Sequence, residues 1–361
     1  MEQYSLAIVG FGGMGNWHRE LINEGTWFSG KKIPGGFNNL KVTGSFDISE
    51  NRQEFARKHE LKAYDSLEDL LDDKTVDIVL VATPNDFHKP LVIKALEAGK
   101  HVVCEKPVAL NSVELQEMID TSHKTGKVFA VHQNRRWDED YLTIKKIFDN
   151  KMLGDVFRIE SRVHGSRGIP GDWRADPKQG GGMVLDWGVH ILDQALQMIP
   201  GKVNKVYATL TNVTTELVDD GFFAELTFDN GLVFLAEVGT SNFVILPRWY
   251  VLGRDGTAVI DDFSRKGKIV RIKDYSKNDA IPIRTAAGLT KTMAPRTEET
   301  IKEEPLPEIQ SDIRDFYRNF VDTMEGKEKL LVSLDSVKRT MKLMEAIFRS
   351  AQEGVPVKFE G

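Results

Sequence analysis

A glycine-rich stretch near the N-terminus constrains the fold more than any other feature. Residues 10–15 read Gly-Phe-Gly-Gly-Met-Gly and lie between an apolar run at 6–9 and a helix-like segment at 16–23. After a strand, the first glycine of G-x-G-x-x-G makes a tight turn, the second lets the backbone approach a pyrophosphate, and the third lets helix and strand pack closely. The pyrophosphate then lies at the positive end of the helix. We therefore predict a dinucleotide site formed by Gly10, Phe11, Gly12, Gly13, Met14 and Gly15.

The length of the chain, 361 residues, predicts two domains. Up to residue 135, continuous apolar runs alternate with helical segments, which favours an α/β domain with a doubly wound parallel sheet. From residue 151, after a linking helix predicted at 138–150, the segments alternate in polarity, and an Asn-Gly turn at 230–231 joins two of them. We expect a dinucleotide-binding domain at 1–135 and an α+β domain at 136–361 with a large, mostly antiparallel, open-faced sheet. A C-terminal helix at 333–352 can pack back onto the first domain.

Charge and composition restrict the partners. The formal net charge is -6, so the chain has no sequence-wide basic surface for nucleic acid or anionic lipid. No stretch approaches the length that spans a bilayer, and the first residues lack the basic region of a signal peptide. The single cysteine, Cys104, cannot form an internal disulfide and is expected in a buried strand. We expect a cytoplasmic protein that binds a small molecule, with no nucleic-acid or membrane partner.

An acidic residue at the end of the second long strand indicates which cofactor binds. Segment 42–47 ends in Asp47, which can accept hydrogen bonds from both hydroxyls of an adenosine ribose. Its charge would repel a 2′-phosphate, and Ile48 and Ser49 add no cation to hold one. Arg52 is the one nearby cation that weakens this preference. The sequence favours NAD over NADP.

Two stretches do not fit the regular pattern. Residues 25–39 are rich in glycine, asparagine and lysine and predict a loop inserted before the second long strand. Its aromatic residues Trp27, Phe28 and Phe37 either pack locally, which we favour, or form a lid or a subunit contact. Residues 276–308 show no clear periodicity and predict an extended arm or loop.

The strand predicted at 77–82 should end at the ligand edge of the sheet, because ligands of open α/β sheets lie at the carboxyl ends of the strands. Thr83, Pro84 and Asn85 follow this strand, and His88 is close behind them. We expect these four residues to border the cofactor. The alternative is a plain strand-to-helix turn capped by Asn85.

The next strand, predicted at 101–104, delivers Glu105 and Lys106 to the same edge. Pro107 follows, and it pushes the backbone before it out of the helical region and forms the one kind of peptide bond that can be cis. We therefore count Glu105 and Lys106 among the residues at the cofactor, although a lysine at a strand end is often only solvated.

The densest polar group outside the first domain comprises Trp173, Arg174, the glycines at 180–182, Asp186 and His190. Asp186 and His190 are four residues apart in a helix predicted at 184–198, which would place both on one face. A carboxylate beside an imidazole orients the ring and tunes a base near neutral pH. A surface ion pair is one alternative. A metal site is another, but zinc usually has at least three protein ligands, so we expect no metal.

Taken together, these motifs resemble the glucose-fructose oxidoreductase and inositol dehydrogenase (Gfo/Idh/MocA) family over nearly the full chain. The resemblance rests on the order and spacing of the glycine motif, Ala82-Thr83-Pro84-Asn85, Glu105-Lys106-Pro107 and the group from Trp173 to His190. It implies a Rossmann domain, an open-faced sheet that forms subunit contacts in a homo-oligomer, and hydride exchange between nicotinamide and a sugar or cyclic polyol. The insertion at 25–39 departs from the family pattern and puts the substrate in doubt.

The resemblance also assigns roles. The family's catalytic lysine maps to Lys106, and its aspartate and histidine map to Asp186 and His190. We hypothesise that a secondary ring hydroxyl is oxidised, with His190 as the base, Asp186 orienting it and Lys106 stabilising the alkoxide; an exchange of roles between Lys106 and His190 stays open. The residues considered for holding the substrate are Lys106, Arg136, Trp173, Arg174, Asp186 and His190, although a core position is as good an account of Trp173.

The expected substrate is a glucose-like pyranose, free or as a glycoside oxidised at its 3-position, or an inositol. Two other classes of function stay open. A redox-assisted glycosidase or lyase would oxidise the sugar transiently with a tightly bound, recycled NAD. A regulator that only senses NAD should have lost the lysine and histidine, which this chain keeps.

Overall fold

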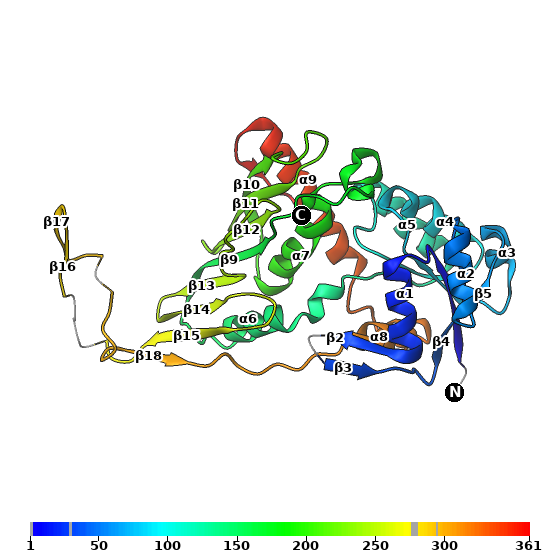
Figure 1. The fold of residues 1–361 in the computed structure, drawn as a ribbon, viewed down its shortest axis with the longest axis horizontal. Coiled ribbons are helices and arrows are strands. Elements are labelled where there is room, and N and C mark those ends of the chain that lie inside the picture. Colours follow the sequence, from blue (N-terminus) through cyan, green and yellow to red (C-terminus); the bar gives the residue numbers. More distant parts are fainter. Residues whose placement is uncertain (1–2, 29–30, 276–280, 294) are drawn as a thin grey trace.

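Two β-sheets organise the protein, one in each half of the chain (Figure 1). The computed structural model describes residues 3–28, 31–275, 281–293 and 295–361, with the side chains of 26–33 left out. This confirms the predicted fold class, an α/β protein with a parallel sheet followed by a larger, mostly antiparallel one. None of the helices in the described ranges is long and apolar enough to cross a membrane.

The first sheet is parallel and has the strand order β5-β4-β1-β6-β7-β8. Its strands are β1 (Tyr4–Val9), β4 (Leu40–Phe46), β5 (Lys62–Ala63), β6 (Ile78–Val81), β7 (His101–Cys104) and β8 (Phe129–Val131). Every residue of β6 is buried, which is why the strand is a continuous apolar run. The strand order reverses at β1, and the loops after β1 and its neighbours therefore form the crevice where such sheets bind ligands.

Helices cover this sheet and begin at clear sequence signals. They are α1 (Gly13–Arg19), the π-helical turn η1 (Glu20–Glu24), α2 (Glu50–Lys58), α3 (Leu67–Asp72), η2 (Asn85–Phe87), α4 (His88–Glu97) and α5 (Ser112–Thr125). The hydroxyl of Ser66 accepts the backbone N–H of Asp69 at the start of α3, and the side chain of Asn111 caps α5 in the same way. Cys104 ends β7 and is fully buried, as predicted.

The insertion at 25–39 differs from the predicted loop. It contains a two-stranded hairpin, β2 (Gly25–Phe28) and β3 (Lys31–Pro34). Phe37 packs against the second half of the chain rather than only on its own domain, because its ring meets Tyr317 edge-on at 6.2 Å between centroids. The side chains of Trp27 and Phe28 lie outside the described part, so the alternatives for them stay open.

The second sheet has the strand order β18-β15-β14-β13-β9-β12-β11-β10-β19. Its strands are β9 (Val156–His164), β10 (Val203–Thr211), β11 (Gly221–Phe228), β12 (Val233–Gly239), β13 (Trp249–Gly253), β14 (Gly256–Ile260), β15 (Gly267–Ile272), β18 (Ile301–Glu304) and β19 (Val357–Lys358). Neighbours are antiparallel except β9 and β12, which run parallel. The sequence did not predict β15 or β18, because both lie in short, polar stretches near the sheet edge.

Helices and turns of the second half connect the two sheets. They are η3 (Asn134–Trp137), α6 (Glu139–Asp149), η4 (Trp173–Ala175), η5 (Pro177–Gln179), η6 (Val184–Gly188), α7 (Val189–Met198), α8 (Arg314–Met324) and α9 (Leu334–Glu353). Helix α9 packs on β10, where Ser350 accepts the N–H of Ala208, and it also reaches α5, where Glu345 accepts the N–H of Ser112 at 2.6 Å. The C-terminal helix thus contacts both halves.

An arm leaves the body of the protein beyond β15 (Figure 1). It carries the short hairpin of β16 (Ile283–Thr285) and β17 (Gly288–Thr290) and returns through β18. Residues 276–280 and 294 of this stretch lie outside the described part. The predicted extended arm is therefore present where the structure describes it.

Candidate active site

The glycine loop after β1 has the shape that the motif predicts. Gly10 has a φ of +90°, and a Cβ there would lie 2.6 Å from the carbonyl oxygen of Ala82. A Cβ on Gly15 would lie 2.4 Å from the carbonyl oxygen of Gly10, so this glycine lets α1 pack closely against the strand. Above Gly12 and Gly13 an added Cβ would meet no atom within 4 Å. The backbone is therefore open where a pyrophosphate would approach.

Asp47 lies directly beside this loop. Its Oδ2 accepts the backbone N–H of Phe11 at 2.7 Å, and its Oδ1 accepts that of Ser49 at 2.9 Å. Each oxygen keeps a lone pair for the hydroxyls of a ribose. The ring of Phe11 is buried against Phe55, so only the backbone of Phe11 can face a cofactor. Arg52 is exposed on α2.

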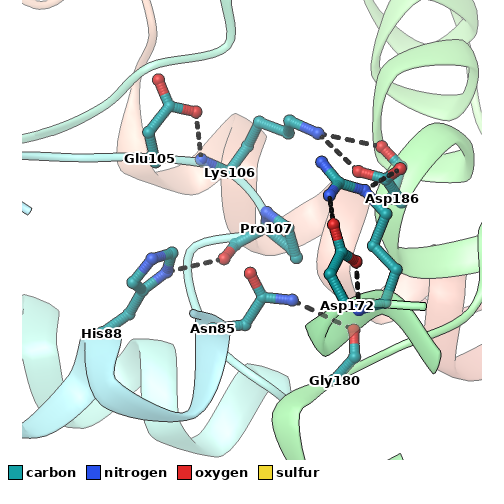
Figure 2. A network of polar contacts seen from close by, with 9 residues as sticks. Asn85, His88, Glu105, Lys106, Pro107, Asp172, Gly180 and Asp186 are labelled. Atoms are coloured by element: carbon teal, nitrogen blue, oxygen red, sulfur yellow. Dashed lines mark hydrogen bonds and ion pairs between the residues drawn. The ribbon is translucent and has the colours of Figure 1, made fainter. Parts of the chain in front are cut away.

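Asn85 and His88 hold loops together, and their predicted contact with the cofactor stays a prediction. Asn85 is 2% exposed, and its side-chain amide donates to the carbonyl oxygen of Gly180 at 3.0 Å (Figure 2). The ring of His88 is fully buried, with Nδ1 2.9 Å from the carbonyl oxygen of Pro107 and Nε2 2.9 Å from that of Thr83. Thr83 and Pro84 follow the end of β6 as predicted, and the ring of His88 contacts the backbone there through the carbonyl oxygen of Thr83.

Lys106 faces the second half of the protein, where Asp186 meets it (Figure 2). Its Nζ donates to the carboxylate Oδ1 of Asp186 at 3.1 Å and to the carbonyl oxygen of the same residue at 3.0 Å. The peptide bond between Lys106 and Pro107 is cis. The other carboxylate oxygen of Asp186 accepts from Nε of Arg174 at 3.0 Å, and Arg174 also pairs with Asp172 at 2.9 Å. One carboxylate therefore holds two cations that come from different domains.

The charges of this group keep Asp186 ionised. Burial alone would raise the pKa of Asp186, but Lys106 and Arg174 outweigh it and the resulting pKa is lowered. Arg174 is further fixed over the ring of Trp173, with 4.4 Å between guanidinium carbon and ring centroid. Both residues lie in η4, between β9 and η6, and they stay candidates for contact with a substrate.

His190 lies in the same region, but Asp186 does not orient it as predicted. Residues 184–188 form the π-helical turn η6, whose wider turn changes the angular offset between the two side chains. The carboxylate of Asp186 bonds Lys106 and Arg174 instead. The His190 ring packs edge-on against Trp187 at 5.7 Å, and its buried Nδ1 has no hydrogen-bond partner among the described residues.

Electrostatics keep this imidazole neutral. Burial, followed by the positive charges of Lys106 and Arg135, holds the pKa of His190 well below its ordinary value. The guanidinium of Arg135 stacks on Trp187 at 4.2 Å, which fixes that charge near the ring. A neutral imidazole can accept a proton, so the arrangement supplies a base in its unprotonated form.

Arg136, predicted to hold substrate, binds other side chains of the protein. Its guanidinium forms a two-point pair with Asp193 at 2.7 Å for each bond, and it also donates to the hydroxyl of Ser336 at 2.9 Å. The two side chains of this pair are 10% and 3% exposed. The pair ties η3 to α7 and α9, so we now interpret Arg136 as a structural residue.

Glu105, predicted at the cofactor, is enclosed in a polar cluster behind Lys106. Its Oε1 lies 2.8 Å from Nε2 of His18 and 2.8 Å from Nδ1 of His132. The hydroxyl of Tyr317 is 2.5 Å from Nδ1 of His18. Glu105, His18 and His132 form the one three-residue group within the described ranges whose ligand atoms are close enough for a metal ion. Hydrogen bonds to one shared oxygen account for these distances without an ion.

Sequence reasoning missed His18, His132, Tyr317 and Arg135. His18 follows the glycine motif by three residues, which is the one local signal that it would lie near the motif. Tyr317 is 299 positions further along the chain, so its contact with His18 depends on the packing of α8. A single sequence carries no direct sign of such a contact.

Comparison with known proteins gives consistent results over both halves. Residues 4–133 match the model of the oxidoreductase family with an NAD-binding Rossmann fold, and residues 141–259 match that of the Gfo/Idh/MocA C-terminal domain. The solved structure of an NAD-binding protein from Listeria innocua is 47% identical, covers 99% of this chain and 100% of its own, and superposes with a TM-score of 0.92.

Two curated relatives that match over most of their length are named as inositol dehydrogenases. A myo-inositol 2-dehydrogenase of Thermotoga maritima is 30% identical over 73% of this chain and 74% of its own length. A scyllo-inositol 2-dehydrogenase (NADP(+)) of Bacillus subtilis is 25% identical over 81% of this chain and 82% of its own length.

Proposed function

Because the chain belongs to the Gfo/Idh/MocA family of oxidoreductases with an NAD-binding Rossmann fold, we propose that it transfers a hydride between NAD and a secondary ring hydroxyl of a sugar, glycoside or cyclic polyol such as an inositol. The observation that carries the proposal is the meeting of Lys106 with Asp186 beside the neutral ring of His190. Proton donors and acceptors of this kind are what the oxidation of an alcohol requires.

The residues of the first domain fit a bound NAD. The open backbone at Gly12 and Gly13 would hold the pyrophosphate, and the free lone pairs of Asp47 would accept the ribose hydroxyls. When bound, the nicotinamide ring supplies the hydride acceptor. Asp47 favours NAD over NADP, although exposed Arg52 is near enough to meet a 2′-phosphate, and one relative is named as NADP-dependent.

The protein groups divide the handling of the proton. His190 is unprotonated and accepts the hydroxyl proton of the substrate. The ammonium of Lys106 donates a hydrogen bond to the developing alkoxide. Asp186 holds that ammonium in place rather than orienting His190, which revises the role that the sequence suggested.

The test is to purify the protein, identify any nucleotide it retains, and follow NADH absorbance with NAD or NADP over a panel of inositols, glucose and glucosides. We expect steady reduction of added NAD by one sugar or cyclitol, and its loss in Lys106→Ala and His190→Ala. Retained NAD together with consumption of a glycoside and no net NADH would contradict the dehydrogenase and support redox-assisted cleavage instead. No turnover and no nucleotide binding would contradict both.

We also propose that the second sheet forms subunit contacts. Charged side chains pair across neighbouring strands of this sheet, with Arg162 bonding Glu237 at 2.9 Å and also contacting Glu160. Charges that are already paired cost less to bury against a second subunit than isolated charges would. Light scattering with size exclusion should give a dimer or tetramer, and a monomer at micromolar concentration would contradict the proposal.

A further inference from the structure

Behind Lys106, on the side away from Asp186, four polar side chains form an enclosed cluster. They are Glu105 after β7, His18 on α1, His132 after β8 and Tyr317 on α8, and we call them the Glu105 cluster. Glu105 is 5% exposed and the other three are fully buried. The proposed reaction assigns none of them a chemical step. Four separate elements therefore meet at one carboxylate that has no assigned role.

The protons of the Glu105 cluster can be placed from its contacts. Burial would raise the pKa of Glu105, but His132 and His18 outweigh it and the pKa is lowered well below its ordinary value, so the group is a carboxylate that only accepts. Both histidines must then donate to it, His18 through Nε2 and His132 through Nδ1. Burial lowers the pKa of His18 to about 4, so His18 is neutral and its Nδ1 accepts from the hydroxyl of Tyr317.

The carboxylate also holds the main chain of the candidate catalytic lysine. Both histidines share Oε1, whereas Oε2 accepts the backbone N–H of Lys106 at 3.1 Å (Figure 2). A carboxylate can accept all three donors because both of its oxygens are acceptors. A carboxamide of the same size has one oxygen and one NH2, so with both histidines in these tautomers it would leave one of the three donors facing another donor. In this arrangement the cluster therefore needs a carboxylate, and a carboxamide would force the histidines to change tautomer.

The position of His18 links this carboxylate to the dinucleotide loop. His18 lies on α1, whose first turn contains the glycines at 13 and 15, and Lys106 follows Glu105 directly. We propose that Glu105 is a positioning residue for the proposed oxidation: with His18, His132 and Tyr317 it ties the backbone of Lys106 to helix α1 and so fixes the lysine relative to the bound cofactor. The expected effect on turnover rests on the proposed function. The structural link between the backbone of Lys106 and helix α1 does not depend on it.

Two substitutions test the link, and a third is the matched control. Glu105→Gln keeps the size and removes one acceptor, and Tyr317→Phe removes only the hydroxyl at the far end. His101→Asn is the control, because His101 begins the same strand β7 and its Nδ1 accepts the N–H of Val128 at 3.0 Å, at the opposite end of that strand from Lys106. The control changes a side chain that makes a comparable internal hydrogen bond, without touching the Glu105 cluster.

The kinetic readout separates positioning from loss of binding. We expect kcat of Glu105→Gln to fall about 10- to 100-fold, the range in which small displacements of reacting groups act. Substrate KM and the calorimetric Kd for NAD should change by less than about threefold, since ground-state contacts are kept. Tyr317→Phe should shift kcat in the same direction by a smaller factor, and His101→Asn should leave it unchanged.

The second readout is hydrogen exchange of the peptide that contains the Lys106 amide, measured on the protein without substrate. Exchange should accelerate in Glu105→Gln and Tyr317→Phe, and not in His101→Asn. Unchanged kcat and exchange in folded Glu105→Gln and Tyr317→Phe would overturn the inference, as would equal losses in His101→Asn. If the wild type oxidises no substrate, the proposed function fails, whereas accelerated exchange would still support the structural link and unchanged exchange would overturn it.

Discussion

Lys106 lies between two carboxylates that hold it in different ways. Glu105 is buried, accepts from two histidines and binds the main-chain N–H of the lysine. Asp186 comes from the other half of the chain and binds the ammonium itself, together with Arg174. The first contact is built into the dinucleotide-binding domain, and the second depends on how η6 of the other half is placed. The comparison indicates that the two halves fix different ends of one residue.

The largest effect should come from removing the residue that both carboxylates hold. Lys106→Ala takes away the donor for the developing alkoxide, and we expect kcat to fall about 10³-fold, within the range measured for general acid–base groups. The measurement is the initial rate of NADH formation at saturating substrate. Lys89→Ala, which breaks an ion pair with Glu117 on the surface, is the control and should retain wild-type turnover. Equal rates for the two variants would exclude Lys106 from the chemistry.

Breaking only the contact on the substrate side should have the next largest effect. Asp186→Asn removes the charge that holds Lys106 and Arg174 together, and kcat/KM should fall about 10²-fold, as for a misplaced reacting group. Unlike Glu105→Gln, it should also raise substrate KM, because Arg174 loses its partner beside the substrate. Steady-state kinetics of both variants give the comparison. If the two variants showed the same division between kcat and KM, the distinction between the two carboxylates would be wrong.

The pH dependence of the reaction tests the base. Burial and the charges of Lys106 and Arg135 place the pKa of His190 well below 6.5. The neutral ring is the active form, so kcat/KM should be constant as the pH falls to 6.5 and decline only at lower pH, by about tenfold per pH unit below the pKa. His190→Asn should remove this acidic limb. A limb centred near or above 6.5 in the wild type would contradict a base that is kept neutral by its surroundings.

Arg136 should have the smallest effect on turnover, because its guanidinium is bound to Asp193 and faces α9. Arg136→Ala leaves a carboxylate that is 3% exposed without its partner, so we expect a loss of about 3–5 kcal/mol in the free energy of unfolding. Substrate KM should stay within about twofold of the wild type. KM would rise only if Arg136 bound the substrate, and its guanidinium is bound to Asp193 instead. Urea unfolding and kinetics on the folded variant measure both. A large rise in KM with unchanged stability would restore Arg136 as a substrate residue.

Local sequence signals predicted the first domain well, because its site is built from backbone geometry. The glycines at 10 and 15 are required where the chain turns and where α1 meets the strand, and Asp47 follows its strand directly. The structure brings the candidate residues Lys106 and Asp186 together, but the predicted pairing of Asp186 with His190 is absent among the described contacts. The prediction assumed an α-helical offset of four residues, whereas residues 184–188 form a π-helical turn that redirects the side chain of Asp186.

The protein partners of several candidate residues were not predicted. Asn85, His88, Glu105 and Arg136 were assigned to ligands from their positions near strand ends. In the fold each of them also binds other protein groups, such as Gly180 for Asn85 and Asp193 for Arg136. Contacts of this kind are decided by tertiary packing, and a single sequence does not encode them locally. The hairpin β2–β3 was missed for a related reason, since it lies in a stretch whose composition is typical of loops.

The most direct test of this account is to introduce Glu105→Gln and Asp186→Asn into the Lys106→Ala background and measure the remaining rate of NADH formation at saturating substrate, where changes in KM do not contribute. If both carboxylates act through Lys106, neither substitution should lower the residual rate further, although each lowers it in the wild type. If either substitution still reduced turnover by its full factor without the lysine, that carboxylate would act by another route. The central claim that the two carboxylates jointly position Lys106 would then be contradicted.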